Sequence, residues 1–269
     1  MKLSIITINY NNSEGLKKTI QSVVNQTVSD FEYIIIDGGS TDGSVDVIKS
    51  FLANSVYRNT ITYWCSEKDT GIYNAMNKGV SHANGEYCLF LNSGDVFVSD
   101  TVIENILPEL KNEDIISCNE SFSDGTVAKP IKDLNLFSYM DGFLPHESTF
   151  IRTERLKKTP YEENYRIVSD YIFFLKDLFF NKATYRTVNQ IITLFNLDGI
   201  SSNNRKLAVD ELNLFYSKTF PPYIMELYES LSYQRRLCKN PIVRFAIYIV
   251  ESKFYHILRF IYRKIKGKS

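Results

Sequence analysis

The chain has 269 residues with 31 basic and 31 acidic side chains, so its formal net charge is zero. Hydrophobic residues make up 44% of the chain and charged residues 23%, a globular composition that excludes a disordered or fibrous protein. The four cysteines show no C-x-x-C spacing, so we expect reduced, buried thiols in a cytosolic protein rather than disulfides or a zinc site. We expect no signal peptide, and no apolar run reaches the ~18 residues that a membrane span requires.

Strand and helix signals alternate over the first 100 residues. Apolar and β-branched runs predict buried strands at residues 3–9, 33–37, 61–65 and 87–91. The intervening segments predict helices from Ser13 to about residue 26, from Ser40 or Thr41 to about residue 52, and from Thr70 onward. Such alternation is typical of an α/β fold with a mainly parallel sheet and right-handed crossovers.

The second half of the chain carries a different pattern. We expect a hairpin around Asp124 and Gly125, a strand at residues 148–152, a helix at residues 169–180 and an extended segment at residues 184–197. After residue 199 the pattern is helical to the end, with breaks at residues 221–222 and 240–241, where prolines stand. A C-terminal helical extension therefore follows the α/β part.

Polar residues cluster where the predicted strands end, which is where parallel sheets bind ligands. Asp37 begins the turn DGGSTDG, whose glycines allow close backbone approach and whose carboxylate can accept hydrogen bonds from a base or a ribose. Asp95 follows another apolar strand and can bind a hard divalent cation together with a diphosphate. An ordinary polar turn is the alternative explanation for each of these segments.

Three further segments carry candidate side chains. Asp69 lies beside a predicted helix start in the block from residue 66 to 79, His146 lies in PHESTF, and Asp170 lies in YRIVSD. Each has a structural alternative: Asp69 as a helix cap, His146 as a satisfied buried histidine, and Asp170 as an acid in the first turn of a helix.

The order of these motifs is more specific than any one of them. NYNN after the first strand, DGGSTDGS after the second, DTGIYNAMNKG and then GEYCLFLNSGD together resemble the family 2 glycosyltransferases of the GT-A fold. The similarity is closest to bacterial members from capsule, O-antigen and colanic-acid clusters. It is strong over residues 1–100, moderate over residues 140–175, and absent after about residue 200.

The resemblance implies roles for particular residues. Those that fall at positions binding the nucleotide-sugar are Thr7, Asn9, Tyr10, Asp37, Asp69, Asn92 and Ser93. Asp95 occupies the D-x-D position that binds the metal, His146 could supplement it, and Asp170 falls at the catalytic base. The motifs also differ from the family pattern: Asn92 and Gly94 stand where two acids are usual, and Ser169 replaces the Glu of the E-D motif.

The implied activity is inverting, metal-dependent glycosyl transfer. The donor would be a nucleotide-diphospho-sugar, most simply a UDP-sugar, with Mn²⁺ or Mg²⁺, and the acceptor a glycan or a polyprenyl-diphosphate-linked sugar in cell-surface polysaccharide biosynthesis. We expect a catalytic domain over residues 1–200, with a nucleotide-sugar half to residue 100 and an acceptor half after it, and a helical extension over residues 201–269. A nucleotidyltransferase and a degenerate sugar-nucleotide-binding protein remain alternatives.

The charge is unevenly distributed along the chain. Residues 234–269 hold ten basic side chains and one acid, a formal charge of +9, whereas the first 233 residues hold 21 basic and 30 acidic side chains, a charge of −9. Residues 241–269 form a basic amphipathic pattern, which predicts a peripheral anchor on an anionic membrane at the inner face of the plasma membrane. Packing on the catalytic domain or on a second subunit, as in a homodimer, is the alternative; no motif indicates nucleic acid.

Overall fold

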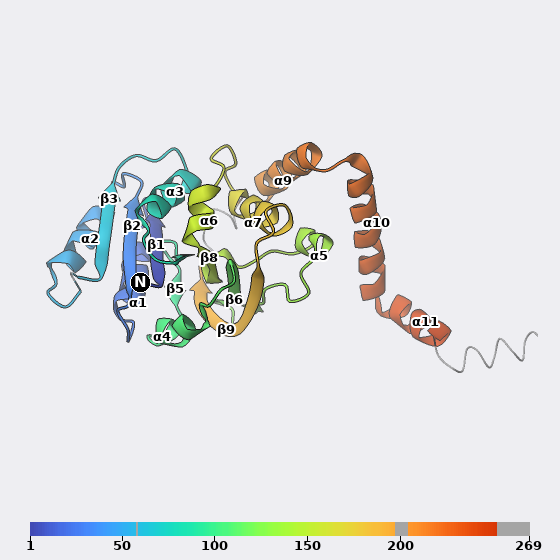
Figure 1. The fold of residues 1–269 in the computed structure, drawn as a ribbon, viewed down its shortest axis with the longest axis horizontal. Coiled ribbons are helices and arrows are strands. Elements are labelled where there is room, and N and C mark those ends of the chain that lie inside the picture. Colours follow the sequence, from blue (N-terminus) through green and yellow to red (C-terminus); the bar gives the residue numbers. More distant parts are fainter. Residues whose placement is uncertain (58, 197–203, 252–269) are drawn as a thin grey trace, which may run out of the picture. The chain divides into compact units, whose positions relative to one another are not determined.

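The structure is a computed structural model that describes residues 1–57, 59–196 and 204–251 (Figure 1). Its contacts divide the chain into two compact units, the first from Met1 to Asn213 and the second beginning at Leu214. The domain boundary expected near residue 200 lies outside the described residues.

The first unit contains the strands and most of the helices. Its strands are β1 (Leu3–Asn9), β2 (Phe31–Asp37), β3 (Ile61–Ser66), β4 (Tyr87–Phe90), β5 (Val96–Phe97), β6 (Ile115–Phe122), β7 (Val127–Ala128), β8 (Thr149–Arg152) and β9 (Tyr185–Phe195). Its helices are α1 (Ser13–Val24), α2 (Ser44–Ala53), α3 (Ile72–His82), α4 (Val102–Ile106), α5 (Leu136–Met140), α6 (Thr153–Lys158) and α7 (Ser169–Phe179). Single 3-10 turns follow α4 (η1, Leu107–Glu109) and precede β8 (η2, His146–Ser148).

These strands join one mixed sheet in the order β3-β2-β1-β4-β8-β6-β9-β5, with β7 beside β6. Strands β1 to β4 run parallel, β8 is antiparallel to both of its neighbours, and β6 and β9 are parallel. Asn9 pairs with Asp37 and Asp37 with Ser66, so the carboxyl ends of β1, β2 and β3 are level. Figure 1 shows these three strands side by side. The level ends bring the polar turns that follow the strands to one edge of the sheet.

Helices cover both faces of this sheet. Leu3 and Ile5 of β1 belong to a buried cluster that also contains Leu16 of α1. Ile6 points to the opposite face, where Gly79 of α3 is so close that a Cβ atom on Gly79 would stand 2.5 Å from Ile6 Cγ2. Because helices cover both faces, the sequence of β1 is mostly apolar throughout and does not alternate between apolar and polar residues.

Three helix starts differ from the sequence prediction. Helix α3 begins at Ile72, after Gly71, and not at Thr70. Asn12 rather than Ser13 caps α1, because the Asn12 side chain accepts the Gly15 N–H at 3.1 Å. Helix α2 begins at Ser44 and not at residues 40–41, because the segment before it wraps around the end of β2. The predicted hairpin and the chain breaks at the prolines are confirmed.

The C-terminal part is helical where it is described. Helix α9 (Arg205–Thr219) spans the boundary between the units, and α10 (Pro222–Lys239) and α11 (Pro241–Glu251) follow in the second. None of the helices in the described part of the chain combines the length and apolar character needed to cross a membrane. All four cysteines are free; Cys88 and Cys118 are buried as expected, but Cys65 is half-buried and Cys238 is exposed.

Candidate active site

Asp37 is the centre of a hydrogen-bond network at the end of β2. Its buried carboxylate accepts Asn9 Nδ2 at 2.7 Å, Ser40 Oγ at 2.6 Å, the Ser40 N–H at 3.0 Å and Ser66 Oγ at 2.5 Å. Burial favours a higher pKa for Asp37, but these donors outweigh it and hold the pKa below its usual value. The carboxylate is therefore ionised at neutral pH, and protein donors occupy its four acceptor positions.

The other predicted nucleoside residues lie in contrasting environments. Thr7 is fully buried, and its hydroxyl donates to the Leu91 carbonyl at 2.7 Å, so it links β1 to the segment after β4. Tyr10 is 67% exposed, and its ring and the Asp69 carboxylate both approach Gly38 closely. Asp69 also forms an ion pair with Lys78 at 2.7 Å. Tyr10 and Asp69 thus flank the turn that follows Asp37.

The loop after β4 links the first half of the unit to the second. Ser93 Oγ donates to the Asn12 carbonyl at 3.2 Å, and Asn92 Nδ2 donates to Glu147 Oε1 at 2.9 Å. Asp95 is only 4% exposed, and its Oδ1 accepts the Asn196 N–H at 2.8 Å. Asn92 Oδ1 is buried and accepts no hydrogen bond from the described residues. The motif of residues 92–95 therefore keeps one carboxylate, that of Asp95, and Glu147 of η2 adds a second one nearby.

Two carboxylates that the sequence analysis did not single out, Glu147 and Glu120, lie within electrostatic reach of Asp95. Burial raises the pKa of Asp95 to about 7; burial and then the charge of Asp95 raise the pKa of Glu147 to about 7. Burial, followed by Glu147 and Asp95, raises the pKa of Glu120 to about 9. Such shifts mean that three negative charges are costly here unless a proton or a cation compensates them. The sequence did contain signals for both residues. Glu120 is the lone acid in the strand of residues 115–122, and Glu147 directly follows the candidate metal ligand His146.

His146 lies among aromatic rings. It is buried, its Nε2 is 2.9 Å from Tyr161 Oη, and its ring stacks on Phe90 with 4.9 Å between the ring centroids. With Nε2 occupied by Tyr161, only Nδ1 is available to a metal. The metal role of His146 stays a prediction.

Asp170 lies in the first turn of α7, half-buried, and its Oδ1 accepts the Tyr73 hydroxyl at 2.7 Å. Burial and then the Asp170 charge raise the pKa of Tyr73 well above its usual value, so the hydroxyl keeps its proton. Among smaller causes, the Asp170 charge also raises the pKa of Glu147, so the two carboxylates lie within electrostatic reach of each other. The fold thus brings the predicted base and the predicted metal ligand to one region.

The donor set suits a hard divalent cation. Oxygen ligands predominate, and burial raises the pKa values of these carboxyls, so that their charged forms need a compensating proton or cation. Within the described ranges no three acidic, histidine or cysteine side chains meet around one point. A cation here would therefore take only part of its coordination from Asp95 and its neighbours, and would need substrate oxygens and water for the rest.

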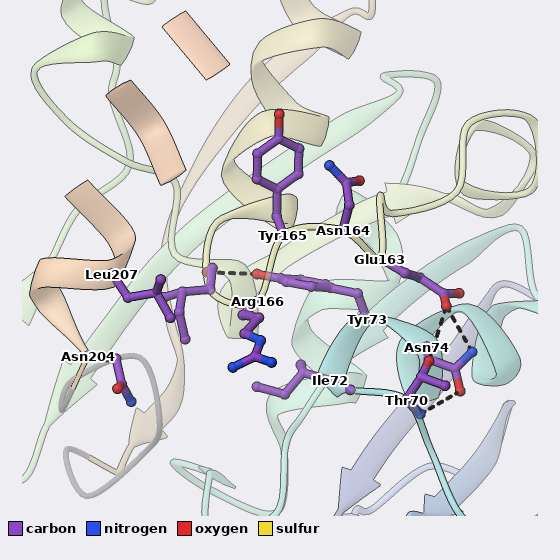
Figure 2. A pocket seen from close by; sticks show the side chains of 12 residues that line it. Thr70, Ile72, Tyr73, Asn74, Glu163, Asn164, Tyr165, Arg166, Asn204 and Leu207 are labelled. Atoms are coloured by element: carbon purple, nitrogen blue, oxygen red, sulfur yellow. Dashed lines mark hydrogen bonds between the residues drawn. The ribbon is translucent and has the colours of Figure 1, made fainter. Parts of the chain in front are cut away.

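A pocket of about 520 Å³ opens beside this region (Figure 2). Its lining comes from the start of α3, the segment before α7 and the start of α9: Thr70, Gly71, Ile72, Tyr73, Asn74, Glu163, Asn164, Tyr165, Arg166, Ile167, Asn204 and Leu207. Tyr73 lines the pocket and also bonds to Asp170, so the pocket adjoins the predicted base.

Comparison with known proteins identifies the class. The family described as glycosyl transferase family 2 matches residues 4–179, and the chain belongs to that family. A PGL/p-HBAD biosynthesis glycosyltransferase of Mycobacterium bovis is 30% identical over 210 residues, 74% of this chain and 78% of the relative. The predicted glycosyltransferase class is thereby confirmed.

Solved structures confirm the fold. S. aureus TarS 1–349 in complex with UDP-GlcNAc has a TM-score of 0.61 at 18% identity, covering 79% of this chain and 67% of that one. Mannosyltransferase PcManGT from Pyrobaculum calidifontis, in complex with GDP-Man and Mn²⁺, has a TM-score of 0.63 at 14% identity, covering 86% and 69%. The GT-A-like α/β fold predicted from the motifs is the fold of this chain.

Proposed function

We propose that this enzyme transfers a sugar, with inversion, from a nucleotide-diphospho-sugar to a glycan or lipid-linked acceptor in cell-surface polysaccharide biosynthesis. The observation that carries the proposal is that Asp95, which follows β4, and Asp170, in the first turn of α7, both lie within electrostatic reach of Glu147 in a family 2 chain. The relative named for PGL/p-HBAD biosynthesis supports a cell-surface product.

The nucleoside would lie over the ends of β1 and β2. Tyr10 is exposed there, and Asn9 Oδ1 is buried without a hydrogen-bond partner among the described residues. A nucleoside donor group that reaches Asp37 has to replace one of the serine hydroxyls, since the carboxylate is already saturated. A UDP-sugar is the first donor to test, because TarS is known in complex with UDP-GlcNAc.

Asp95 would hold Mn²⁺ or Mg²⁺ against the donor diphosphate, with Glu147 and Glu120 adding negative charge around it. The cation supplies charge neutralisation of the diphosphate leaving group. Asn92, at the usual place of an acid, donates to Glu147 and so fixes that carboxylate beside Asp95.

Asp170 would act as the general base. The acceptor hydroxyl is a weak nucleophile, and Asp170 removes its proton as the bond to the sugar forms. Tyr73 holds Oδ1 of this carboxylate, which leaves Oδ2 for the acceptor. One base facing the sugar from the side opposite the leaving group gives a single displacement and therefore inversion.

A screen of nucleotide-sugars by thermal shift, with and without Mn²⁺, tests the donor assignment. We expect one class of nucleotide-sugar to raise the melting temperature more strongly in the presence of the cation, because each ligand completes the other's site. No shift with any nucleotide-sugar at millimolar concentration would contradict the proposal.

The C-terminal segment would anchor the enzyme at the cytoplasmic face of the plasma membrane. In the described part, Ile242, Phe245 and Tyr248 of α11 are exposed; residues 252–269, with most of the predicted basic face, lie outside the described residues. Binding to anionic vesicles should weaken in high salt without vanishing, since the apolar contribution is insensitive to salt. Loss of dimerisation rather than of vesicle binding on truncation after Asn240 would instead make the segment a subunit interface.

A further inference from the structure

The pocket beside Asp170 is not explained by donor binding or by the acidic cluster. It lies within the first unit, between the start of α3 and residues 163–167. The Tyr73 hydroxyl is 2.7 Å from Asp170 Oδ1 and 2.7 Å from the Ile167 carbonyl oxygen, so one side chain joins the pocket lining to the base. A ligand in this pocket therefore lies beside Tyr73, the side chain that bonds to Asp170.

Arg166 gives the pocket its charge. Its side chain is exposed, and its guanidinium makes no ion pair or hydrogen bond with any described residue. The backbone is nevertheless fixed, because the N–H groups of Arg166 and Ile167 donate to the Glu211 carboxylate at 2.7 and 3.0 Å. Figure 2 shows the guanidinium between Tyr73 and Ile72. Arg166 therefore offers a ligand a guanidinium that is unpaired among the described residues and stands on a fixed backbone.

The acid that shares the pocket does not neutralise Arg166. Glu163 accepts Asn74 Nδ2 at 3.0 Å and Asn77 Nδ2 at 3.1 Å, and Thr70 Oγ1 at 3.4 Å. Figure 2 shows this group apart from the Arg166 guanidinium. The pocket thus has an acid that is bound by protein donors and, apart from it, a guanidinium that no described residue pairs.

The start of α3 adds positive potential to the pocket lining, and Thr70 and Asn74 there donate to Glu163. Gly71 precedes the helix without a side-chain cap, and a Cβ atom on Gly71 would meet nothing within 4 Å. The first N–H groups of a helix carry a partial positive charge, which strengthens the attraction that Arg166 already provides.

We propose that this pocket binds an oxyanion of the acceptor, a phosphate or a carboxylate, with Arg166 as its counter-charge. Guanidinium groups bind both oxyanions through paired N–H···O hydrogen bonds. A neutral glycan would leave Arg166 without a counter-charge. The proposal rests on the proposed function, since it takes Asp170 as the base that receives the acceptor hydroxyl.

Calorimetry on the full chain tests the proposal. The probes are glucose 1-phosphate, glucuronate and glucose, each titrated with the donor site filled by UDP and Mn²⁺ and again without them. The variants are Arg166→Gln and, as matched control, Arg236→Gln, which removes an exposed guanidinium from α10. UDP itself is titrated into every variant.

We expect glucose 1-phosphate or glucuronate to bind the wild-type chain, and Arg166→Gln to weaken that binding by about tenfold or more, as loss of a charged hydrogen bond does. Arg236→Gln should behave as wild type, and UDP affinity should be equal in all three proteins. Whether the phosphate or the carboxylate probe binds more tightly identifies the anion.

Three results would overturn the proposal: equal affinity for glucose and the charged probes, no effect of Arg166→Gln, or no binding of either charged probe at millimolar concentration. If Arg166→Gln weakens UDP as much as the probes, Arg166 belongs to the donor site and the proposal is wrong. Failure of UDP to bind the wild-type chain would count against the proposed function instead, and the titrations without UDP would still test the pocket.

Discussion

Tyr73 connects the predicted base to the rest of the protein. Its single hydroxyl proton can be donated to Asp170 or to the Ile167 carbonyl, both at 2.7 Å, but not to both at once. The hydroxyl therefore fixes the position of the Asp170 carboxylate, although the Ile167 carbonyl competes for the same proton. This makes Tyr73 a positioning residue for the base.

The variant Tyr73→Phe should lower kcat by about tenfold, the equivalent of one hydrogen bond to a charged group, with donor KM unchanged. Steady-state kinetics with varied donor measures both. Tyr139→Phe is the matched control, because it removes another buried hydroxyl, one that donates to the Tyr171 carbonyl of α7. If both variants lose the same activity, or if donor KM rises with kcat unchanged, the positioning role is wrong.

Asp95 should determine metal affinity. Asp95→Asn keeps an oxygen that can accept the Asn196 N–H but removes the charge. We expect Mn²⁺ affinity in the presence of UDP, measured by electron paramagnetic resonance, to fall by at least the 10–100-fold that loss of a supporting residue costs. The exposed Asp100→Asn is the control. Unchanged Mn²⁺ affinity in Asp95→Asn would remove Asp95 from the metal site.

At the scale of elements, Glu32 holds three segments of the sheet together. Its carboxylate, 4% exposed on β2, accepts the Ser4 hydroxyl of β1 and the N–H groups of Asn84 and Gly85 before β4. Burial alone would raise the pKa of Glu32, but the hydrogen bonds from Ser4, Asn84 and Gly85 lower it below the usual 4.5. The ionised form therefore stabilises the junction of β1, β2 and β4.

Glu32→Gln should destabilise the protein by about 1–3 kcal/mol at pH 7, because it replaces a charged acceptor and leaves buried donors unpaired. A folded-state pKa below the unfolded value means that this stabilisation is present above about pH 4.5 and is lost as the pH falls through the lowered pKa. Urea unfolding between pH 3 and 7 should show the difference from wild type shrinking at acid pH. A constant difference, or an equal loss in the exposed Glu14→Gln, would contradict this role.

At the scale of the whole molecule, short sequence patterns predicted the sheet well but predicted the candidate site only in part. Buried apolar runs and the polar residues after them are local, so β1 to β4 and the places of Asp37 and Asp95 were predictable. Glu120 and Glu147 lie far from Asp95 in sequence and reach it only because β8 pairs with both β4 and β6. The pocket was not predictable for the same reason, since residues 70–74 meet residues 163–167 only in the folded chain.

The measurement that tests the central claim most directly compares wild type with Asp170→Asn for nucleotide release from a nucleotide-sugar. The account predicts release by wild type with Mn²⁺ and none with a chelator. In Asp170→Asn, release should fall by roughly 10²–10⁴-fold, as for loss of a general base, while calorimetry shows unchanged UDP affinity. Near wild-type release by Asp170→Asn, or loss of UDP binding in it, would contradict the assignment of Asp170 as the base of a glycosyl transfer.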